Sequence, residues 1–392
     1  MRAITGDSKL TIFLEGDIVS ANAADAEAEI RRLIAEHPGL PVCLDAGDLR
    51  RISSAGLRVL LKLSKALPQP PVIRNVSADV YDTFEVTGFT SLIDIRRKPR
   101  ELSIEGCEII GTGAKGTVYR LDEDTVVKVF HGGEEELPDI ESEQNKAKGA
   151  FLAGVPTAIP FDIVRVGDHY GTVYEMVDAR NCNDVIKAEP ERLEEIIEQF
   201  AAFLHTLHGL KAEPGQLTGT RDVFLGYVDI AAPALPAPLA ERLRALLRAM
   251  PAELGLLHGD MHLKNVMLSD GQMMLIDMDS LSAGNPVFEF GGLYAAYIAF
   301  CEGDSNNTMQ FFGIDRETAA HIVKKSLELY LGSPDADTLR AVWKKIQIAG
   351  YLRYIYILMA ELAERVQPDD FRVRQAVQSL EELVKEVDEL AM

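Results

Sequence analysis

The chain has 392 residues, more than one compact core normally holds, so its length predicts two or three domains. Hydrophobic residues make up 47% of the chain and charged residues 26%, which is typical of a folded globular protein and excludes a disordered or collagen-like chain. The formal net charge of −21 excludes a general nucleic-acid binder, because an acidic surface repels phosphate polymers.

The charge is distributed unevenly along the chain. Residues 1–100 carry 14 Lys and Arg against 13 Asp and Glu, a balance of +1, whereas residues 101–392 carry −22. This difference indicates two modules. The polar stretch RRKPRELSIE at 96–105 lies where the balance changes, so we expect a first domain over 1–98, a linker over 99–105 and a second domain over 106–392.

The remaining global features favour a cytoplasmic protein. The four cysteines form no C-x-x-C pair, so neither a zinc site nor a disulfide framework is expected. The N-terminus, MRAITGDSKL, lacks the apolar core of a signal peptide. The longest apolar run, near Leu293–Cys301, is about half the ~20 residues that a membrane span needs, so no membrane segment is expected.

In the first hundred residues, short apolar runs alternate with segments of helical periodicity. The expected strands are Lys9–Ile18, Pro41–Ala46, Pro71–Val76 and Ser91–Ile95, and the expected helices are Ala23–His37, Ser54–Ala66 and Ala78–Thr87. Ser53 or Ser54 suits the N-cap of the second helix. The alternation predicts an α/β domain with one sheet and helices packed on it.

From residue 106 the pattern changes to a strand-rich piece followed by a helix-rich piece. The expected strands are Cys107–Gly111, Thr117–Leu121, Thr125–Phe130, Ala158–Arg165 and Gly171–Met176, with a helix near Ile140–Leu152. The later helices expected are Glu189–Leu210, Ala237–Ala249, Arg316–Leu331, Asp335–Glu364 and Phe371–Leu390. This order predicts a two-lobed α+β domain with an N-lobe over 106–177 and a C-lobe over 178–392.

A glycine-rich segment, GTGAKGTV, joins the first two strands of the second domain. Its glycines are Gly111, Gly113 and Gly116. Glycines between antiparallel strands let backbone N–H groups approach phosphate oxygens. A strand follows in place of a helix, which excludes a dinucleotide-binding turn. The segment therefore indicates a phosphate loop, with a plain glycine hairpin as the alternative.

Lys128 lies in the next strand, TVVKVF, twelve residues after Gly116. A lysine in an apolar strand is costly unless it faces a partner. The hairpin spacing puts its amine beneath the glycine loop, where nucleotide phosphates would lie. A carboxylate on the following helix would hold it there. Glu143 fits this role best, and Glu141 is the alternative.

The segment HGDMHLKNVML carries Asp260 and Asn265 five residues apart, and Asp277 follows the apolar run MLI. Phosphoryl transfer needs a carboxylate that accepts the hydroxyl proton and oxygen ligands for a cation that neutralises the phosphates. Asp260 suits the first role. Asn265 and Asp277 suit the second, with Mg²⁺ as the cation.

Residues 106 to about 390 resemble the aminoglycoside phosphotransferase and choline kinase group of the protein-kinase-like superfamily. The resemblance rests on G-x-G-x-x-G-x-V, the VVK lysine, H-G-D-x-x-x-x-N and the following I-D. HGD in place of H-R-D, and IDMDS in place of a DFG motif, favour the small-molecule branch over protein kinases.

The resemblance implies roles for individual residues. Asp260 corresponds to the catalytic base, Asn265 and Asp277 to the Mg²⁺ ligands, and Lys128 with Glu143 to the ion pair that binds the phosphates of ATP. The stretch TVYEMV resembles the hinge that binds adenine through backbone groups. The nucleotide contacts that it implies are Glu175 and Val177.

Residues 9–97 resemble a STAS domain, the fold of bacterial anti-sigma-factor antagonists, through LTIFLEGDI, CLDAGDL, SSAGLRVLL and TGFTSLIDI. In that family the second helix usually begins with D-S-[ST]-G, so Ser54 corresponds to the phosphorylatable serine and Ser53 replaces the aspartate. Free N–H groups at a helix start stabilise a phosphate. Ser54 is therefore a candidate phosphosite, with helix capping as the alternative role.

Three functional interpretations remain open. The first is an ATP-dependent phosphotransferase acting on a hydroxyl of a small molecule, with the STAS domain as a regulatory or docking module for a protein partner. The second is a regulatory protein of anti-sigma-factor-antagonist type whose kinase-like domain phosphorylates protein serine. The third, a nucleotide-binding pseudokinase, is opposed by the retained Lys128, Asp260, Asn265 and Asp277. A cationic acceptor would fit the helical-lobe carboxylates Glu302, Asp304, Glu361 and Glu364, whose alternative role is a solvated helix face.

Overall fold

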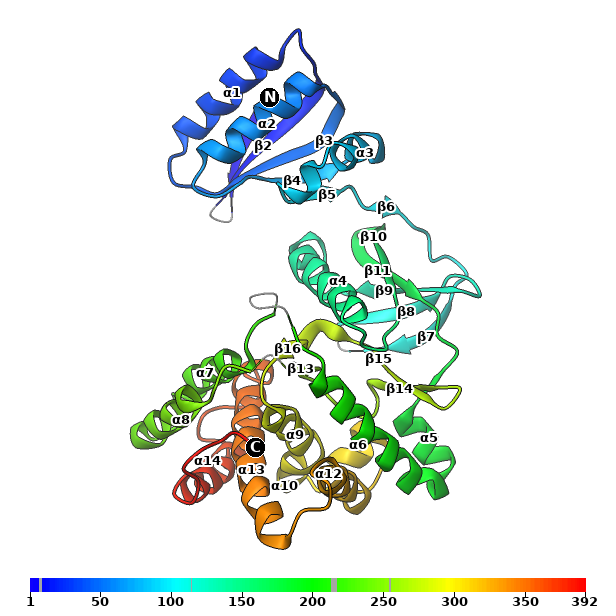
Figure 1. The fold of residues 1–392 in the computed structure, drawn as a ribbon, viewed down its shortest axis with the longest axis vertical. Helices are drawn as coiled ribbons and strands as arrows, with labels where there is room; N and C mark the ends of the chain where they lie inside the picture. Colours follow the sequence, from blue (N-terminus) through cyan, green and yellow to red (C-terminus); the bar gives the residue numbers. More distant parts are fainter. Residues whose placement is uncertain (7–8, 114, 213–216, 254) are drawn as a thin grey trace. The chain divides into compact units, whose positions relative to one another are not determined.

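The computed structural model describes residues 1–6, 9–113, 115–212, 217–253 and 255–392 (Figure 1). These residues divide into two compact units, Met1–Ser103 with Val164–Gly167 and Ile104–Ile163 with Asp168–Met392. Each unit has its own hydrophobic core, and the two cores of described residues share no member.

The first unit contains one five-stranded sheet in the order β1-β2-β3-β4-β5. Its strands are β1 (Arg2–Gly6), β2 (Lys9–Ile18), β3 (Val42–Ile52), β4 (Val72–Val76) and β5 (Ile95–Arg97), and its helices are α1 (Ala23–Glu36), α2 (Ser54–Ala66) and α3 (Ala78–Val86). β1 is antiparallel to β2, and the other neighbours are parallel. The predicted α/β domain with one sheet and packed helices is confirmed.

Two details of this unit differ from the sequence prediction. β1 was not predicted, because its five residues mix polar and apolar side chains without a clear pattern. The prediction of a strand over Ser91–Ile95 is wrong. Gly88 takes a positive φ of 75° after α3, a short 3-10 helix occupies Phe89–Ser91, and the strand begins only at Ile95.

Helix α2 shows how the sequence fixes the position of Ser54. Leu57, Leu60 and Leu63 recur at helical spacing, and all three are buried. A Cβ on Gly56 would lie 2.8 Å from the carbonyl oxygen of Ile18, so only glycine permits this approach of the helix to β2.

The second unit begins with a small lobe built on the sheet order β10-β11-β9-β8-β7. These strands are β7 (Glu108–Thr112), β8 (Gly116–Arg120), β9 (Thr125–Phe130), β10 (Pro160–Val166) and β11 (His169–Glu175), and the helix is α4 (Leu137–Leu152). β9 has a hydrogen-bonded strand on each side. The segment expected as a linker, 99–105, contains a two-residue strand, β6 (Arg100–Glu101), which pairs in parallel with Val164 and Arg165.

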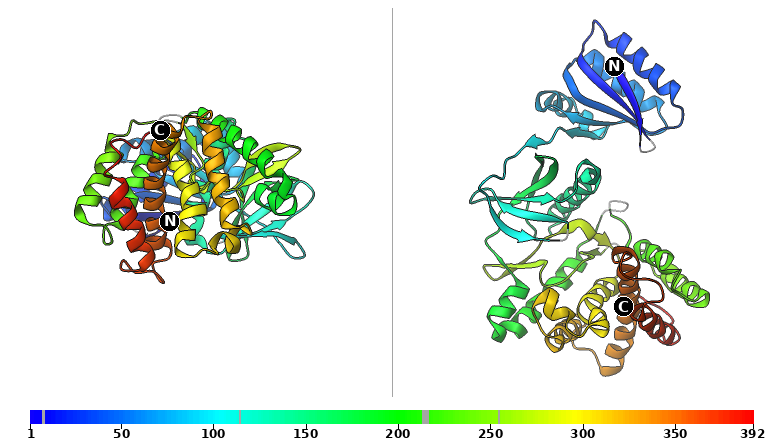
Figure 2. Two further views of the ribbon diagram at one scale, coloured as in Figure 1. Left: turned by 90° about the horizontal axis from the view of Figure 1, so that it is seen from below. Right: turned by 180° about the vertical axis from the view of Figure 1, so that it is seen from behind.

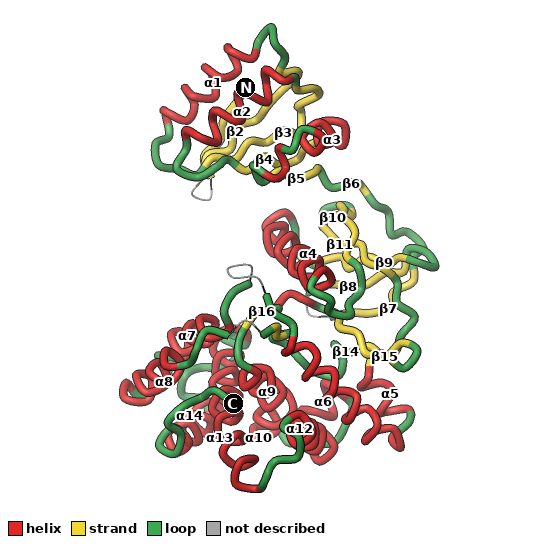
Figure 3. Tube along the Cα trace, viewed as in Figure 1, coloured by secondary structure: helices red, strands yellow, loops and turns green. Residues whose placement is uncertain are grey.

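The rest of the second unit is mainly helical, and the predicted two-lobed α+β arrangement is confirmed (Figure 3). Its helices are α5 (Cys182–Ala188), α6 (Leu193–Gly209), α7 (Thr220–Ala231), α8 (Ala237–Ala249), α9 (Pro286–Tyr294), α10 (Phe300–Gly303), α11 (Asn307–Phe312), α12 (Arg316–Tyr330), α13 (Ala336–Tyr356) and α14 (Phe371–Leu383). The long helix α13 packs against α7, α9 and α14 (Figure 2).

Several helix ends differ from the prediction for local reasons. α6 begins at Leu193, because Pro190–Arg192 form a 3-10 turn before it. α13 passes into a π-helical turn at Ile357–Glu361, and α14 ends at Leu383. No helix among the described residues is both long and apolar enough to cross a membrane.

Two small sheets in the large lobe hold the segments that carry the predicted catalytic residues. β12 (Arg180–Asn181), β14 (Val266–Ser269) and β15 (Gln272–Leu275) form one, and β13 (Leu256–Leu257) pairs with β16 (Ser282–Ala283) in the other. The segment between β13 and β14 contains Asp260 and Asn265, and the segment between β15 and β16 contains Asp277. Each segment is therefore anchored in sheet at both ends.

Candidate active site

Lys128 joins the two lobes of the second unit. Its Nζ donates to Glu143 Oε1 at 2.8 Å and to Asp277 Oδ1 at 3.0 Å. The lysine lies on β9, which has a neighbour on each side, and only 16% of its side chain is exposed. Burial alone would lower the pKa of Lys128, but Asp277 and Glu143 outweigh it and raise this pKa. The ammonium is therefore held in its charged form.

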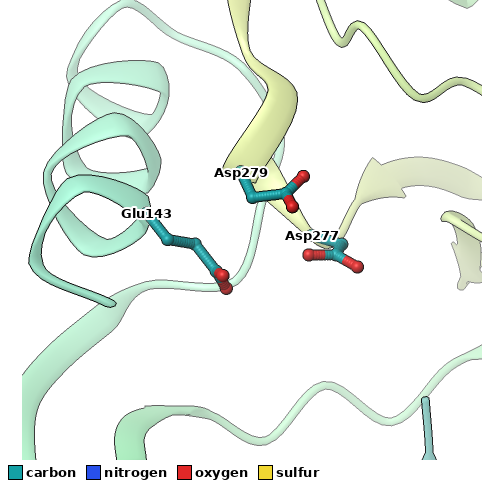
Figure 4. Close-up of side chains that lie close together, drawn as sticks. All are labelled: Glu143, Asp277 and Asp279. Carbon is teal, nitrogen blue, oxygen red and sulfur yellow. The ribbon is translucent and has the colours of Figure 1, made fainter. Parts of the chain in front are cut away.

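Both carboxylates that accept from this lysine belong to a cluster of three, which Figure 4 shows. Single oxygens of Glu143, Asp277 and Asp279 lie within 4.8 Å of one another. Burial raises the pKa of Glu143, and Asp277 and Asp279 raise it further against the effect of Lys128. Burial opposes ionisation of Asp279 too, but its hydrogen bond from Lys115 prevails and lowers its pKa. The negative charge of the cluster is balanced by the ammonium groups of Lys115 and Lys128.

The glycine loop reaches this cluster through Lys115, whose Nζ forms an ion pair with Asp279 Oδ2. Gly116 must be glycine, because a Cβ there would lie 2.6 Å from the carbonyl oxygen of Val129. Gly111 and Gly113 have room for a Cβ, and the N–H of Gly113 donates to the carbonyl of Gly116 at 2.9 Å. Whether the loop binds phosphate stays a prediction.

The loop that carries Asp260 is anchored by a buried carboxylate, Glu289 on α9. Its two oxygens accept the backbone N–H groups of His258 at 2.6 Å and Gly259 at 3.0 Å. His208 Nε2 lies 3.6 Å from Glu289 Oε2. Burial works against ionisation of Glu289, but His208 and the His258 amide lower its pKa below the ordinary value. The ionised carboxylate thus fixes the backbone next to Asp260.

Gly259 explains why the motif reads HGD. Its φ is 83°, in the left-handed region that favours glycine. A Cβ at this position would also clash with the carbonyl oxygen of Ser280. A larger residue before Asp260 would therefore force the 257–266 segment away from the 275–282 segment.

Asp260 is held by an arginine from a distant helix. Arg353, on α13, donates through Nη2 to Asp260 Oδ1 at 2.8 Å and through Nη1 to the carbonyl of Gly259. Asn265 Nδ2 donates to the backbone oxygen of Asp260 at 3.0 Å, which ties both predicted residues into one loop. His262 Nε2 lies 3.8 Å from Asp260 Oδ2, and burial lowers the pKa of this imidazole.

The expected adenine hinge follows β11. The N–H of Glu175 donates to the carbonyl of Ile159 at 2.9 Å, and its carboxylate accepts the Ile159 N–H at 3.4 Å. Val177 is half-buried just after the strand. The Glu175 N–H is engaged within the fold, so adenine recognition by this segment would use the Glu175 carbonyl and the Val177 N–H, which stays a prediction.

Ser54 lies in the first unit as the exposed first residue of α2. Ser53 occupies the N-cap position with extended backbone angles, and its side chain makes no capping hydrogen bond. Its hydroxyl oxygen is buried and has no hydrogen-bond partner among the described residues. The exposure of Ser54 leaves its hydroxyl open to solvent.

Sequence reasoning missed three residues that shape this site. Asp279 lies two positions after Asp277 in IDMDS, so a second carboxylate was visible but its direction was not. Glu289 belongs to NPVFEF, where a charge in an apolar run signals a buried partner. Arg353 carries no local signal, because its contact with Asp260 spans 93 residues.

The comparisons with known proteins cover both units. Residues 106–321 match the model of the phosphotransferase enzyme family (APH), and residues 1–102 match the STAS domain. Over 92 residues the chain is 38% identical to BtrV of Bordetella bronchiseptica, which bears the name of an anti-sigma factor antagonist. The match covers 23% of this chain and 78% of that protein.

Solved structures of similar fold include two with phosphotransferase names. A choline/ethanolamine kinase family protein from Mesorhizobium loti has 16% identity and a TM-score of 0.46, covering 72% of this chain and 89% of that one. Aminoglycoside phosphotransferase APH(3'')-Id from Streptomyces rimosus, in complex with ADP and streptomycin, has 18% identity and a TM-score of 0.45. This match covers 64% of this chain and 92% of the Streptomyces rimosus chain.

The role of Glu289 generates a prediction for the variant Glu289→Gln. The amide places an NH₂ donor against a backbone N–H that now meets a carboxylate oxygen, so the variant should lose about 1–3 kcal/mol of stability at pH 7. The lowered pKa of Glu289 means that the ionised carboxylate stabilises the fold above about pH 4.5 and that this contribution is lost as the pH falls further. The difference in free energy of unfolding between wild type and Glu289→Gln should therefore become smaller below that pH.

Urea denaturation at a series of pH values measures this difference. Glu382→Gln, an exposed change on α14, is the matched control and should be neutral throughout. A Glu289→Gln variant as stable as this control at pH 7 would contradict the anchoring role.

Proposed function

We propose, because this chain belongs to the phosphotransferase enzyme family, that its second unit transfers the γ-phosphate of ATP to a hydroxyl group of a small molecule. The observation that carries the proposal is the contact of Lys128 with both Glu143 and Asp277, at 2.8 and 3.0 Å. It places a buried cation from the small lobe beside the aspartates of the large lobe, which is the arrangement that phosphate binding between the lobes needs.

In the proposed reaction Asp260 is the base. The acceptor hydroxyl oxygen attacks the γ-phosphorus while its proton passes to the Asp260 carboxylate. The bond between the γ-phosphorus and the bridging oxygen breaks, and ADP leaves with the electron pair. Arg353 binds Oδ1 of Asp260, so Oδ2 is the oxygen left to take the proton.

Lys128 has two partners in the present structure, and the proposal assigns them different fates. Glu143 is buried and also accepts a hydrogen bond from the Tyr174 hydroxyl at 3.2 Å, so it stays as the fixed partner. Asp277 is more exposed, and a phosphate oxygen would take its place at the ammonium. The lysine would then bind ATP without moving out of its ion pair.

The donor set around the lysine fits Mg²⁺. Asp277 and Asp279, which belong to the carboxylate cluster, and the side-chain oxygen of Asn265, which the family resemblance assigns to the same cation, would supply the hard oxygen ligands that Mg²⁺ prefers. When bound there, Mg²⁺ neutralises phosphate charge. The cation would then replace Lys115 at Asp279 and Lys128 at Asp277. Both ammonium groups would be free to bind phosphate oxygens.

We further propose that the STAS domain is a regulatory or docking module for a protein partner. Its likeness to a protein that bears the name of an anti-sigma factor antagonist supports this role. A pseudokinase is the weaker alternative, since the chain retains Lys128, Asp260 and Asp277 and brings Lys128 and Asp277 into contact.

Binding of Mg-ATP should raise the melting temperature of the wild-type protein. A ligand at a hundredfold its Kd stabilises the folded state by about 2.7 kcal/mol. Lys128→Ala removes the phosphate partner, so this variant should lose most of the shift. Differential scanning fluorimetry measures it, with the exposed Lys148→Ala on α4 as control. Equal shifts in wild type and Lys128→Ala would contradict the nucleotide site.

Asp260→Asn should abolish turnover and leave Mg-ATP binding intact. The change keeps the shape of the side chain and removes the proton acceptor, which contributes about 10²–10⁴-fold to the rate. ADP release with an accepted hydroxyl compound measures turnover, and the melting shift measures binding. Asp270→Asn, in the turn between β14 and β15, is the control. Retention of most turnover in Asp260→Asn would show that another group is the base.

A serine on protein is the second candidate acceptor, favoured by the exposure of Ser54 at the start of α2. If the second unit phosphorylates this serine, incubation of the full chain with Mg-ATP should produce a Ser54 phosphopeptide. Mass spectrometry detects it, and Asp260→Asn should remove it. An unlabelled Ser54 in protein that consumes ATP, or equal labelling in the Asp260→Asn control, would eliminate this candidate.

A further inference from the structure

A cavity of about 210 Å³ lies in the second unit beside the loop that carries Asp260. Its lining includes Gly259, the neighbour of Asp260, and Arg353, which binds Asp260 directly. Ser280, the neighbour of Asp279, lines it as well. The cavity is therefore lined by residues adjacent in the chain to the proposed base and to Asp279 of the carboxylate cluster, the region that an acceptor hydroxyl must approach.

We propose that this cavity binds the acceptor, and that the acceptor is a small hydroxyl compound carrying an anionic group, a carboxylate or a phosphate monoester. The inference rests on the proposed phosphotransferase function and specifies the substrate class of that site.

Two cations face the cavity with capacity to bind an anion. Lys146 donates one hydrogen bond, to the backbone carbonyl of Asp279, and an ammonium group has three N–H donors. Arg353 uses two of its nitrogens for Gly259 and Asp260, but a guanidinium has five N–H donors, so others remain for a ligand.

An ammonium group would find no open carboxylate among the described lining residues. Glu289 is the carboxylate in that lining, and both of its oxygens accept backbone N–H groups. Asp260 is next to the lining residue Gly259 in the chain. Its Oδ1 accepts from Arg353, and its Oδ2 is the oxygen that the proposed reaction assigns to the acceptor hydroxyl. The carboxylates that suggested a cationic acceptor from sequence, Glu302, Asp304, Glu361 and Glu364, are not among the lining residues.

The size and walls of the cavity favour a short acceptor. Its volume is below the roughly 300–1,000 Å³ of pockets for drug-sized ligands. Phe224 and Phe288 form an apolar wall, and the side chains of Thr218, Tyr227 and Ser280 add hydroxyl groups. A chain of a few carbons with one hydroxyl and one anionic end matches this combination.

The test compares acceptors and one pair of variants in the full chain. Glycerate and glycerol phosphate represent the two anionic groups, glycerol is the neutral control, and ethanolamine, choline and streptomycin represent cations. ADP release is measured with each compound under saturating Mg-ATP. We expect turnover with an anionic acceptor, and which of the two is accepted identifies the group.

Lys146→Gln and Lys148→Gln remove the same charge two residues apart on α4, but Lys148 contacts Gln144 and does not line the cavity. Lys146→Gln should raise KM for the anionic acceptor by about tenfold or more, since a charge-assisted hydrogen bond is lost, and should raise it by a larger factor than KM for Mg-ATP, because Lys146 contacts Asp279 only at its backbone carbonyl. Lys148→Gln should leave both constants unchanged. Equal constants in the two variants would overturn the assignment.

The remaining outcomes separate this inference from the proposed function. Turnover with cationic compounds but with neither anionic one would overturn the inference and support the function. Absence of both turnover and a melting shift with Mg-ADP would refute the function itself. If Mg-ADP binds and no compound is turned over, the anion site is tested by adding millimolar inorganic phosphate to the Mg-ADP complex and measuring the melting temperature. A rise in melting temperature that Lys146→Gln abolishes supports the anion site. An unchanged melting temperature in the wild-type protein overturns it.

Discussion

The mutual repulsion of three carboxylates is the constraint around which the candidate site is arranged. At the 4.8 Å limit that separates the oxygens of Glu143, Asp277 and Asp279, two like charges repel by roughly 3–4 kcal/mol at an effective dielectric constant near 20. Lysines from two elements answer this repulsion, Lys115 from the glycine loop and Lys128 from β9. A cluster of carboxylates that attracts this much positive charge is suited to a divalent cation.

The backbone around the carboxylates is held in conformations that ordinary residues avoid. Gly259 and Asp277 have φ values of 83° and 66°, and only the first is a glycine. A left-handed residue other than glycine costs of the order of 1–2 kcal/mol, so other contacts must impose it on Asp277. The pairing of β13 with β16, the β14–β15 hairpin and the bonds from Glu289 to the loop amides supply them. The strain lies where the aspartate must point toward the small lobe.

The sequence was informative wherever local pattern and chemistry agree. A charged residue inside an apolar strand identified Lys128, and helix spacing identified Glu143 as its partner, because both signals are short-range. The choice between the aspartates of IDMDS depends on the turn after β15, which no local pattern specifies. The contact of Arg353 with Asp260 could not be predicted, because α13 meets the Asp260 loop only through tertiary packing. The strand β1 and the ends of α6 and α14 escaped for the same reason, because pairing and packing set them.

The charge of the acceptor site illustrates why net charge does not predict specificity. Residues 101–392 carry −22, which by itself suggests an affinity for cations. Yet Glu289, the carboxylate among the described lining residues of the cavity, is occupied by two backbone amides, and Glu302 accepts from the Tyr351 hydroxyl at 2.8 Å. What a ligand meets is the set of groups whose hydrogen-bonding capacity is left over. In this cavity those groups include N–H donors of Lys146 and Arg353, which is why the proposed acceptor is anionic although the lobe is acidic.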